Sequence, residues 1–256
     1  MITEARRKKI LELLEREGIV NLQQLTDAFD VSIYTIRRDL TALEKKGLLK
    51  KTHGGAIRIE KSKWIPSMEE EKNIALSEKK IIALKAAQLI DNGDTIMLLG
   101  SMISILMIPI LKDKNITVVT NSLDVAKDFS AISTIETILI GGQVKNYKGN
   151  ILGSRAIYDV KNYHFDKAFI PCAGIQAHAG VSTSTIDSSD FLKTVIACSR
   201  QNIVVADYRK IGRVTFAKVC SLDKIDMLIT DQKANADELK RMEKLGIHVE
   251  IGNSLA

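Results

Sequence analysis

Cysteine and histidine are scarce in this 256-residue chain, and their scarcity limits the chemistry it can support. The three cysteines, Cys172, Cys198 and Cys220, are an odd number, lie far apart and form no C-x-x-C pair. We therefore expect small buried thiols in a reducing compartment, and neither disulfides nor a metal site. None of the four histidines sits at metal-ligand spacing from another. The sequence predicts no metal and no cofactor.

The chain also lacks a segment well suited to crossing a membrane. Residues 95–111 run for 17 positions without a charge, at the lower limit of length for a membrane helix. However, Gly100 and Pro109 interrupt this run, and its first half has the pattern of a short strand, so a buried strand followed by a buried helix explains it. No apolar core of a signal peptide follows the basic residues near the amino terminus. We expect a soluble, cytoplasmic protein with no membrane partner.

Positive charge is concentrated in the first quarter of the chain. Residues 1–63 contain 14 Lys and Arg against 9 Asp and Glu, whereas the remainder contains 23 against 22. A small basic region joined to a larger, nearly neutral one is typical of a protein that binds a polyanion with one end only. The length allows one small and one medium domain, each with its own core.

Residues 32–40, with the sequence SIYTIRRDL, predict the start of a DNA-reading helix. Ser32 can cap its first turn. Ile36, Leu40 and Leu43 recur on one face, which therefore packs on a core. The side chains left off this face, near the helix start where they can enter a major groove, are Tyr34, Thr35, Arg37 and Arg38. A basic amphipathic helix is often only a solvated surface, so the neighbouring elements decide between the two interpretations.

The neighbouring elements favour a winged helix-turn-helix. Apolar positions predict one helix over residues 6–16 and a short helix over 21–29, which a tight turn joins to the DNA-reading helix. Residues 48–57 predict a small hairpin with Gly54 and Gly55 at its tip. This hairpin is the wing, and the basic side chains that it places near backbone phosphates are Lys50, Lys51 and His53.

Ten positions within 35 residues fall at the spacings of the signature of DeoR-family bacterial transcriptional regulators, and the chain resembles this family. The matching positions are Arg6, Ile10, Leu14, Ser32, Thr35, Ile36, Arg37, Arg38, Asp39 and Leu40. Residues 51–55 also resemble the end of the family's DNA-binding domain. Within the match we assign Asp39 to structure, and Ile36 and Leu40 to the core. The residues expected to contact DNA are first Thr35, Arg37 and Arg38, then Tyr34, with Ser32, Lys50, Lys51, His53, Gly54 and Gly55 completing the set.

The rest of the chain predicts a larger α/β domain. Short apolar runs alternate with helical patterns from residue 77 onward, which argues for a mostly parallel sheet covered on both faces. The expected strands are residues 95–99, 116–120, 135–140, 167–170, 203–206, 227–230 and 248–251, and the expected helices include 123–129, 156–163, 189–199 and 236–245. We therefore divide the chain into a winged helix-turn-helix domain at residues 1–58, a linker at 59–76, and an effector-sensing and oligomerisation domain at 77–256.

Ligands of such a sheet bind beyond the carboxyl ends of the strands, where turns and helix amino termini offer backbone N–H groups. Glycine and polar residues follow several of the expected strands. The candidate effector-binding residues are Gly100, Ser101, Ser104, Asn121, Ser122, Gly141, Gly142, Lys145 and Asp207. A pair of glycines after a strand is more often a turn than a phosphate-binding loop, so no single position identifies the ligand.

Further segments resemble the DeoR-type sensor domain, which implies a fold similar to sugar-phosphate isomerases and a phosphorylated metabolite as effector. They are residues 92–96, 118–122, 139–142, 165–169, 204–207 and 225–231. The loop that usually reads Asp-Ser-Gly-Thr-Thr-Thr in the family corresponds here to residues 99–104, where aliphatic and thioether groups replace an acid and two hydroxyls. Ala173 stands where the family has an acid, and Leu192, next to Lys193, where it commonly has a lysine. We therefore expect an altered site, with either a less polar effector or weaker binding.

These features predict a sequence-specific regulator, a repressor of an operon for sugar or carbon metabolism, that binds double-stranded operator DNA as a homo-oligomer. A DNA-binding oligomer with a non-responsive sensor is the alternative. A sugar-phosphate isomerase would need a placed acid or base. The positions that should hold it, Leu99 and Ala173, cannot titrate, and nothing in the sequence pairs Asp187, Asp190 or Asp207 with a base. We therefore expect no catalytic residue and no enzyme.

Overall fold

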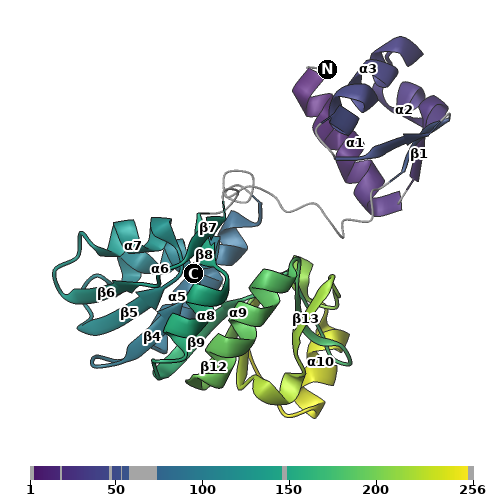
Figure 1. The fold of residues 1–256 in the computed structure, drawn as a ribbon. Coiled ribbons are helices and arrows are strands. Elements are labelled where there is room, and N and C mark those ends of the chain that lie inside the picture. Colours follow the sequence, from purple (N-terminus) through teal and green to yellow (C-terminus); the bar gives the residue numbers. More distant parts are fainter. Residues whose placement is uncertain are drawn as a thin grey trace. The chain divides into compact units, whose positions relative to one another are not determined.

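The chain forms two compact units, Met1–Trp64 and Ile65–Ala256, each of which is described by itself (Figure 1). The computed structural model describes residues 3–17, 19–45, 48–52, 54–57, 74–145 and 149–252. Most of the expected linker at 59–76 lies outside the described residues, so the domain boundaries stay a prediction.

Within its described residues, the first unit has the elements of a winged helix-turn-helix. They are α1 (Thr3–Glu17), β1 (Ile19–Asn21), α2 (Leu22–Phe29), α3 (Ile33–Lys45), β2 (Lys50–Thr52) and β3 (Gly55–Ile57). The strands form an antiparallel sheet in the order β1-β3-β2. The predicted stripe of Ile36, Leu40 and Leu43 is buried in one core with Ile10 of α1 and Leu25 of α2, which confirms the assignment of this stripe to the core.

Strand β1 was not predicted, because three residues are too few to show a strand period. It pairs with β3, and the pairing depends on Gly55, since a Cβ there would lie 2.0 Å from the carbonyl oxygen of Val20. Gly55 is therefore buried at the start of β3, and its expected place at the wing tip is wrong. Gly54 does lie in the turn, where its carbonyl accepts the N–H of Leu22 at 2.8 Å.

The second unit is an α/β domain built on a seven-stranded parallel sheet in the order β15-β14-β12-β9-β4-β5-β6. Its strands are β4 (Thr95–Leu98), β5 (Ile116–Thr120), β6 (Ile135–Leu139), β9 (Phe165–Pro171), β12 (Ser199–Val205), β14 (Met227–Asp231) and β15 (His248–Gly252). Each expected strand is one of these seven. The prediction of a mostly parallel α/β domain is confirmed.

Helices cover both faces of the sheet (Figure 1). The helices are α5 (Leu76–Gln88), α6 (Met102–Leu111) and α7 (Leu123–Phe129) on one face, and α8 (Ser154–Val160), α9 (Ile186–Ala197) and α10 (Ala236–Lys244) on the other. The uncharged run 95–111 is β4 followed by α6, as expected from its pattern. No helix in the described ranges is both long and apolar enough to span a bilayer.

Several short elements of this unit were not predicted. They are the antiparallel sheet of β10 (Gly174–Gln176), β11 (Gly180–Thr183) and β13 (Ala217–Cys220), the hairpin of β7 (Gln143–Lys145) and β8 (Asn150–Leu152), and the 3-10 turns η1 (Tyr208–Lys210) and η2 (Leu222–Lys224). The helix expected at 189–199 is α9, but both of its predicted bounds are wrong, since α9 spans Ile186–Ala197. It ends earlier than predicted because Ser199 is the first residue of β12, where it pairs with Phe165. The helix expected at 156–163 likewise begins earlier and ends at Val160.

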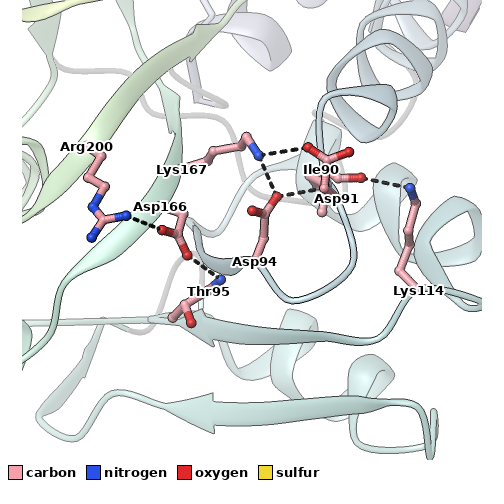
Figure 2. A network of polar contacts seen from close by, with 8 residues as sticks. All are labelled: Ile90, Asp91, Asp94, Thr95, Lys114, Asp166, Lys167 and Arg200. Carbon is pink, nitrogen blue, oxygen red and sulfur yellow. Dashed lines mark hydrogen bonds and ion pairs between the residues drawn. The ribbon is translucent and has the colours of Figure 1, made fainter.

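A polar network fixes the amino ends of β4, β9 and β12 (Figure 2). Asp166 accepts the N–H of Thr95 at 2.9 Å and pairs with Arg200 at 3.2 Å, while Lys167 pairs with Asp94 at 2.5 Å. Burial lowers the pKa of Lys167, but the hydrogen bond and charge of Asp94 outweigh it and hold the pKa above its ordinary value. The Asp-Lys pair at the start of β9 is thus structural, and it lies at the edge of the sheet opposite the candidate effector residues.

Candidate DNA-binding surface and effector site

The exposed face of α3 carries the side chains predicted to read DNA. Tyr34 is 76% exposed, and Arg37 and Arg38 are exposed on the same helix. The Ser32 hydroxyl accepts the N–H of Thr35 at 3.3 Å and lies 3.0 Å from the Thr35 hydroxyl, so it caps the first turn. A capped helix start with two exposed arginines can enter a major groove, contact phosphates and donate two hydrogen bonds to guanine.

Asp39 does not belong to this exposed face. Its side chain is only 2% exposed, and its two oxygens accept from Arg6 Nε at 2.6 Å and Arg7 Nε at 2.7 Å. Both arginines lie on α1, so the carboxylate joins α1 to α3 from inside the unit. The assignment of Asp39 to structure is confirmed. Asp39 thereby fixes the helix that presents Arg38.

The wing is fastened to the same helix through Lys51. The ammonium group of Lys51 donates to the hydroxyl of Thr41 at 2.8 Å, and that hydroxyl donates to the carbonyl of Arg37 at 2.8 Å. The backbone N–H of Lys51 donates to Glu44 at 2.8 Å. Lys51 is therefore half-buried, with two further ammonium hydrogens available for a phosphate. The side chain of Lys50 and the whole of His53 lie outside the described residues, so their predicted contacts stay predictions.

Replacing Lys51 by alanine should weaken binding to all DNA sequences to a similar extent, because we expect its ammonium group to contact a phosphate, which is the same in every sequence. We expect the slope of log K against log salt to become shallower by about one unit. Thr41→Ala is the matched control, since it removes the hydrogen-bond acceptor but keeps the charge and should leave the slope unchanged. An unaltered slope for Lys51→Ala would remove Lys51 from the phosphate contacts.

The candidate effector residues after β4 and β5 do lie together, at the carboxyl edge of the sheet. The N–H of Gly100 donates to the side chain of Asn121 at 3.2 Å. Ser101 caps α6 by accepting the N–H of Ser104 at 3.1 Å, and the buried Ser104 hydroxyl donates to the carbonyl of Leu99 at 2.5 Å. Ser122 caps α7 in the same manner. Two helix amino termini therefore begin at this edge, each with a serine cap.

The β7–β8 hairpin closes over these residues. Asn150 of β8 donates to the carbonyl of Gly100 at 3.3 Å, while Ile151 and Asn121 exchange two hydrogen bonds of 2.6 and 3.1 Å. A Cβ on Gly100 would lie 2.0 Å from the Asn150 amide oxygen and 2.9 Å from the Ser122 Cβ, so any other residue would have to displace the Asn150 side chain. The polar groups expected to hold an effector are thus already paired within the chain. Asn150 gave no signal in the sequence, because it lies in a three-residue strand.

Of the remaining candidates, Lys145 lies next to the cluster as the strand partner of Asn150, and a Cβ on Gly142 would lie 2.9 Å from Ile151. Gly141 donates its N–H to Asp159 at 3.2 Å, and Gly142 has a φ of 147° that favours glycine. Lys145 pairs with Asp187 at 2.8 Å. Asp207 follows β12, which β9 and β4 separate from β5.

Asp207 is buried, and its two oxygens accept from the Arg209 guanidinium at 2.7 Å each. At the end of the adjacent strand, Asp231 accepts the N–H of Tyr208 at 2.8 Å. Burial raises the pKa of Asp231, and the hydrogen bonds that it accepts from the backbone oppose this shift. These acids hold the turns beyond β12 and β14.

Each acid considered for catalysis forms an ion pair with a lysine or an arginine, and such a cation is not a general base. Besides Asp187 and Asp207, Asp190 pairs with Lys193 at 3.1 Å at a half-exposed site. Lys193 therefore points outward and does not replace the missing family lysine, whereas Leu192 is buried in the core. Among the described residues, no group of His, Cys, Asp and Glu has the geometry of a metal site.

The three cysteines are free thiols, as predicted, but they are only partly buried. Burial raises the pKa of Cys172 to about 12 and that of Cys220 to about 11. Both thiols are therefore protonated near neutral pH and weak nucleophiles.

Two family models match consecutive parts of the chain. Residues 6–62 match the DeoR-like helix-turn-helix domain, and residues 74–232 match the DeoR C terminal sensor domain. Among solved structures, ribose 5-phosphate isomerase A from Methanocaldococcus jannaschii has a TM-score of 0.40 and 15% identity, with 53% of this chain and 54% of that chain covered.

Curated relatives are similar over nearly their whole length. The uncharacterized HTH-type transcriptional regulator YulB of Bacillus subtilis (strain 168) is 33% identical over 249 residues, which cover 97% of this chain and 96% of that protein. The HTH-type transcriptional repressor GlcR of the same organism is 31% identical, with the same coverage. The lactose phosphotransferase system repressor of Lactococcus lactis subsp. lactis is 31% identical over 95% of this chain and 97% of its own. With both domain models matched in order and relatives of this identity along its length, the chain belongs to the DeoR family of helix-turn-helix transcriptional regulators.

Proposed function

We propose that the protein represses an operon for sugar or carbon metabolism, and that it binds the operator in the cytoplasm as a homo-oligomer. The observation that carries the proposal is the exposed α3 face with Arg37 and Arg38, fixed from behind by Asp39. Similar proteins support the choice of pathway, since GlcR, the lactose phosphotransferase system repressor and the glycerol-3-phosphate regulon repressor of Escherichia coli (strain K12) are all named as repressors. A symmetric oligomer would present two copies of α3 to half-sites about 34 Å apart, or a multiple of that spacing.

A phosphorylated metabolite bound at the carboxyl edge of the sheet would control this binding. The support is chemical: α6 and α7 both begin there, and helix amino termini favour anions. An effector that binds one state of the sensor better would change operator affinity by roughly 1–3 kcal/mol.

A DNA-binding oligomer with a non-responsive sensor is the second candidate, and one observation favours it. The carbonyl of Gly100 and the side chain of Asn121 already bond to the β7–β8 hairpin. An effector that uses these groups has to displace Asn150, and the free energy needed to break the hydrogen bonds of Asn150 lowers the apparent affinity of the effector.

A ligand screen on the full chain distinguishes a repressor controlled by an effector from a DNA-binding oligomer with a non-responsive sensor. Sugar phosphates and other phosphorylated metabolites would be tested by thermal shift, with the unphosphorylated sugars as controls, and the hits by release of bound DNA. For a true effector we expect stabilisation of about 2.7 kcal/mol at 100 times its Kd. Asn150→Ala should tighten the same ligand, because it removes the competing amide. If no metabolite raises the melting temperature of the wild type or of Asn150→Ala, and none releases DNA from either protein, the sensor is non-responsive.

A further inference from the structure

Helix α6 differs from the other described helices of its unit in having no Asp, Glu, Lys or Arg. It lies between α5 and α7 on one face of the sheet (Figure 1). The one hydroxyl in the helix, on Ser104, is fully buried and bonded to Leu99. A helix that covers a sheet normally turns polar side chains to the solvent. This helix has none to turn.

One side of α6 packs into the core, where Ile103, Met107 and Leu111 are buried. The other side is apolar as well, with half-exposed and exposed side chains. We call it the α6 face, and it consists of Ile105, Leu106, Pro109 and Ile110. Pro109 and Ile110 are the exposed members of this face, and Ile110 is 38% exposed. Contiguous apolar surface of this kind on a water-soluble protein marks an interaction site.

We propose that the α6 face packs against the α6 face of a second copy of this chain, related by a twofold axis. The proposal rests on the homo-oligomer of the proposed function and names its contact surface. In a twofold contact the same patch meets itself, so the patch has to be self-complementary. An uncharged apolar patch fulfils this condition, because apolar side chains pack on each other in either direction.

Charged residues directly after α6, and others on α7, which packs against α6, argue for a copy of the chain over DNA. They are exposed and of both signs, with Asp113, Asp124 and Asp128 opposing Lys112 and Lys127. A surface for DNA would need positive charge alone. An apolar centre with a rim of mixed charge is the composition of an interface between subunits, where acids of one copy can pair with lysines of the other.

The position of α6 also gives the contact a regulatory consequence. Its capping residue is Ser101, and the candidate effector loop at Gly100 leads directly into its first turn. A ligand at this loop would therefore act on the helix whose outer side forms the subunit contact. A small displacement of α6 would change the relative orientation of the two copies, and with it the spacing of the two α3 helices.

Ile110→Glu in the full chain tests the proposal, with the mass measured by sedimentation over a range of concentrations. A charge at the centre of the contact is buried twice per dimer, so we expect the dissociation constant to rise by roughly 100-fold or more. Leu245→Glu is the matched control, because Leu245 is 54% exposed on another element and should not change the mass. Far-ultraviolet circular dichroism spectra equal to that of the wild type show that both variants are folded, whereas the melting temperature of Ile110→Glu should fall because the subunit contact stabilises the fold by mass action.

Two results would overturn the inference: a monomeric wild type, or an Ile110→Glu variant that keeps the wild-type mass. In the second case the chain still forms an oligomer through another surface, and the proposed repressor stands. DNA-binding measurements further distinguish failure of the α6 contact from failure of the proposed repressor function. Ile110→Glu should lose affinity for a double half-site and retain the affinity for a single half-site, whereas failure of the proposed function would abolish specific binding to both.

Discussion

Replacing Asp39 by alanine should lower the free energy of unfolding of the first unit by about 3–5 kcal/mol. The mutation removes the buried carboxylate that pairs with the buried guanidinium of Arg6 and with the partly exposed guanidinium of Arg7, and so breaks the link between α1 and α3. A unit of this size has only a few kcal/mol of stability in total. We therefore expect it to be largely unfolded at 25 °C, and specific DNA binding to be lost with it.

Calorimetry of the full chain measures this effect, because the two units should unfold in separate transitions. Asp39→Ala should abolish or strongly shift the transition of the first unit and leave that of the second unchanged. The control is Asp27→Ala on α2, where the exposed carboxylate accepts a hydrogen bond from the exposed side chain of Gln23; its cost should stay within about 0.5 kcal/mol. A wild-type first transition in Asp39→Ala would contradict the structural role given to this residue.

Replacing Phe169 by alanine should have an effect of the same size on the other unit. Phe169 is fully buried in β9, a central strand, and packs in the cluster that joins the sheet to α5, α6 and α7. Loss of the ring leaves a cavity in this layer, so we expect a cost of about 3–5 kcal/mol in the free energy of unfolding of the second unit.

The same calorimetric experiment checks this variant, with the transition of the first unit as internal reference. Phe216→Ala is the matched control, since Phe216 is 66% exposed and its removal creates no cavity. In Phe216→Ala, the free energy of unfolding of the second unit should stay within about 0.5 kcal/mol of the wild-type value. A shift of both transitions in Phe169→Ala would mean that the two units unfold as one, contrary to the division of the chain at its linker.

The sequence predicts the first unit well because its helices are amphipathic. The spacing of Ile36, Leu40 and Leu43 defines the buried side of α3, and this in turn defines the exposed side with Arg37 and Arg38. The partners of Asp39 lie 32 and 33 positions away, and no local pattern connects them. A buried ion pair of this kind is visible only once α1 and α3 are packed.

The candidate effector site was less predictable for a similar reason. Continuous apolar strands locate the carboxyl edge of the sheet, and the strand-end residues Gly100, Asn121 and Ser122 lie beside each other there. What covers them could not be predicted, because β8 has three residues and Asn150 acts through a contact with Gly100 that is 50 positions away. The short strands β10, β11 and β13 escaped detection likewise, since they are too short to show a period.

The central claim is that α3 reads operator DNA through its exposed arginines. The most direct test selects duplexes from a random pool with the full wild-type chain, and then measures the Kd of wild type and Arg38→Ala for the selected sequence at one fixed salt concentration. We predict that the selection enriches a sequence with two half-sites. Arg38→Ala should lose about 1–3 kcal/mol of binding free energy for this sequence. Its affinity for random DNA should fall only by the small amount that the loss of one positive charge causes. A pool without any enriched sequence, or an Arg38→Ala variant that binds the selected duplex as tightly as the wild type, would contradict the claim.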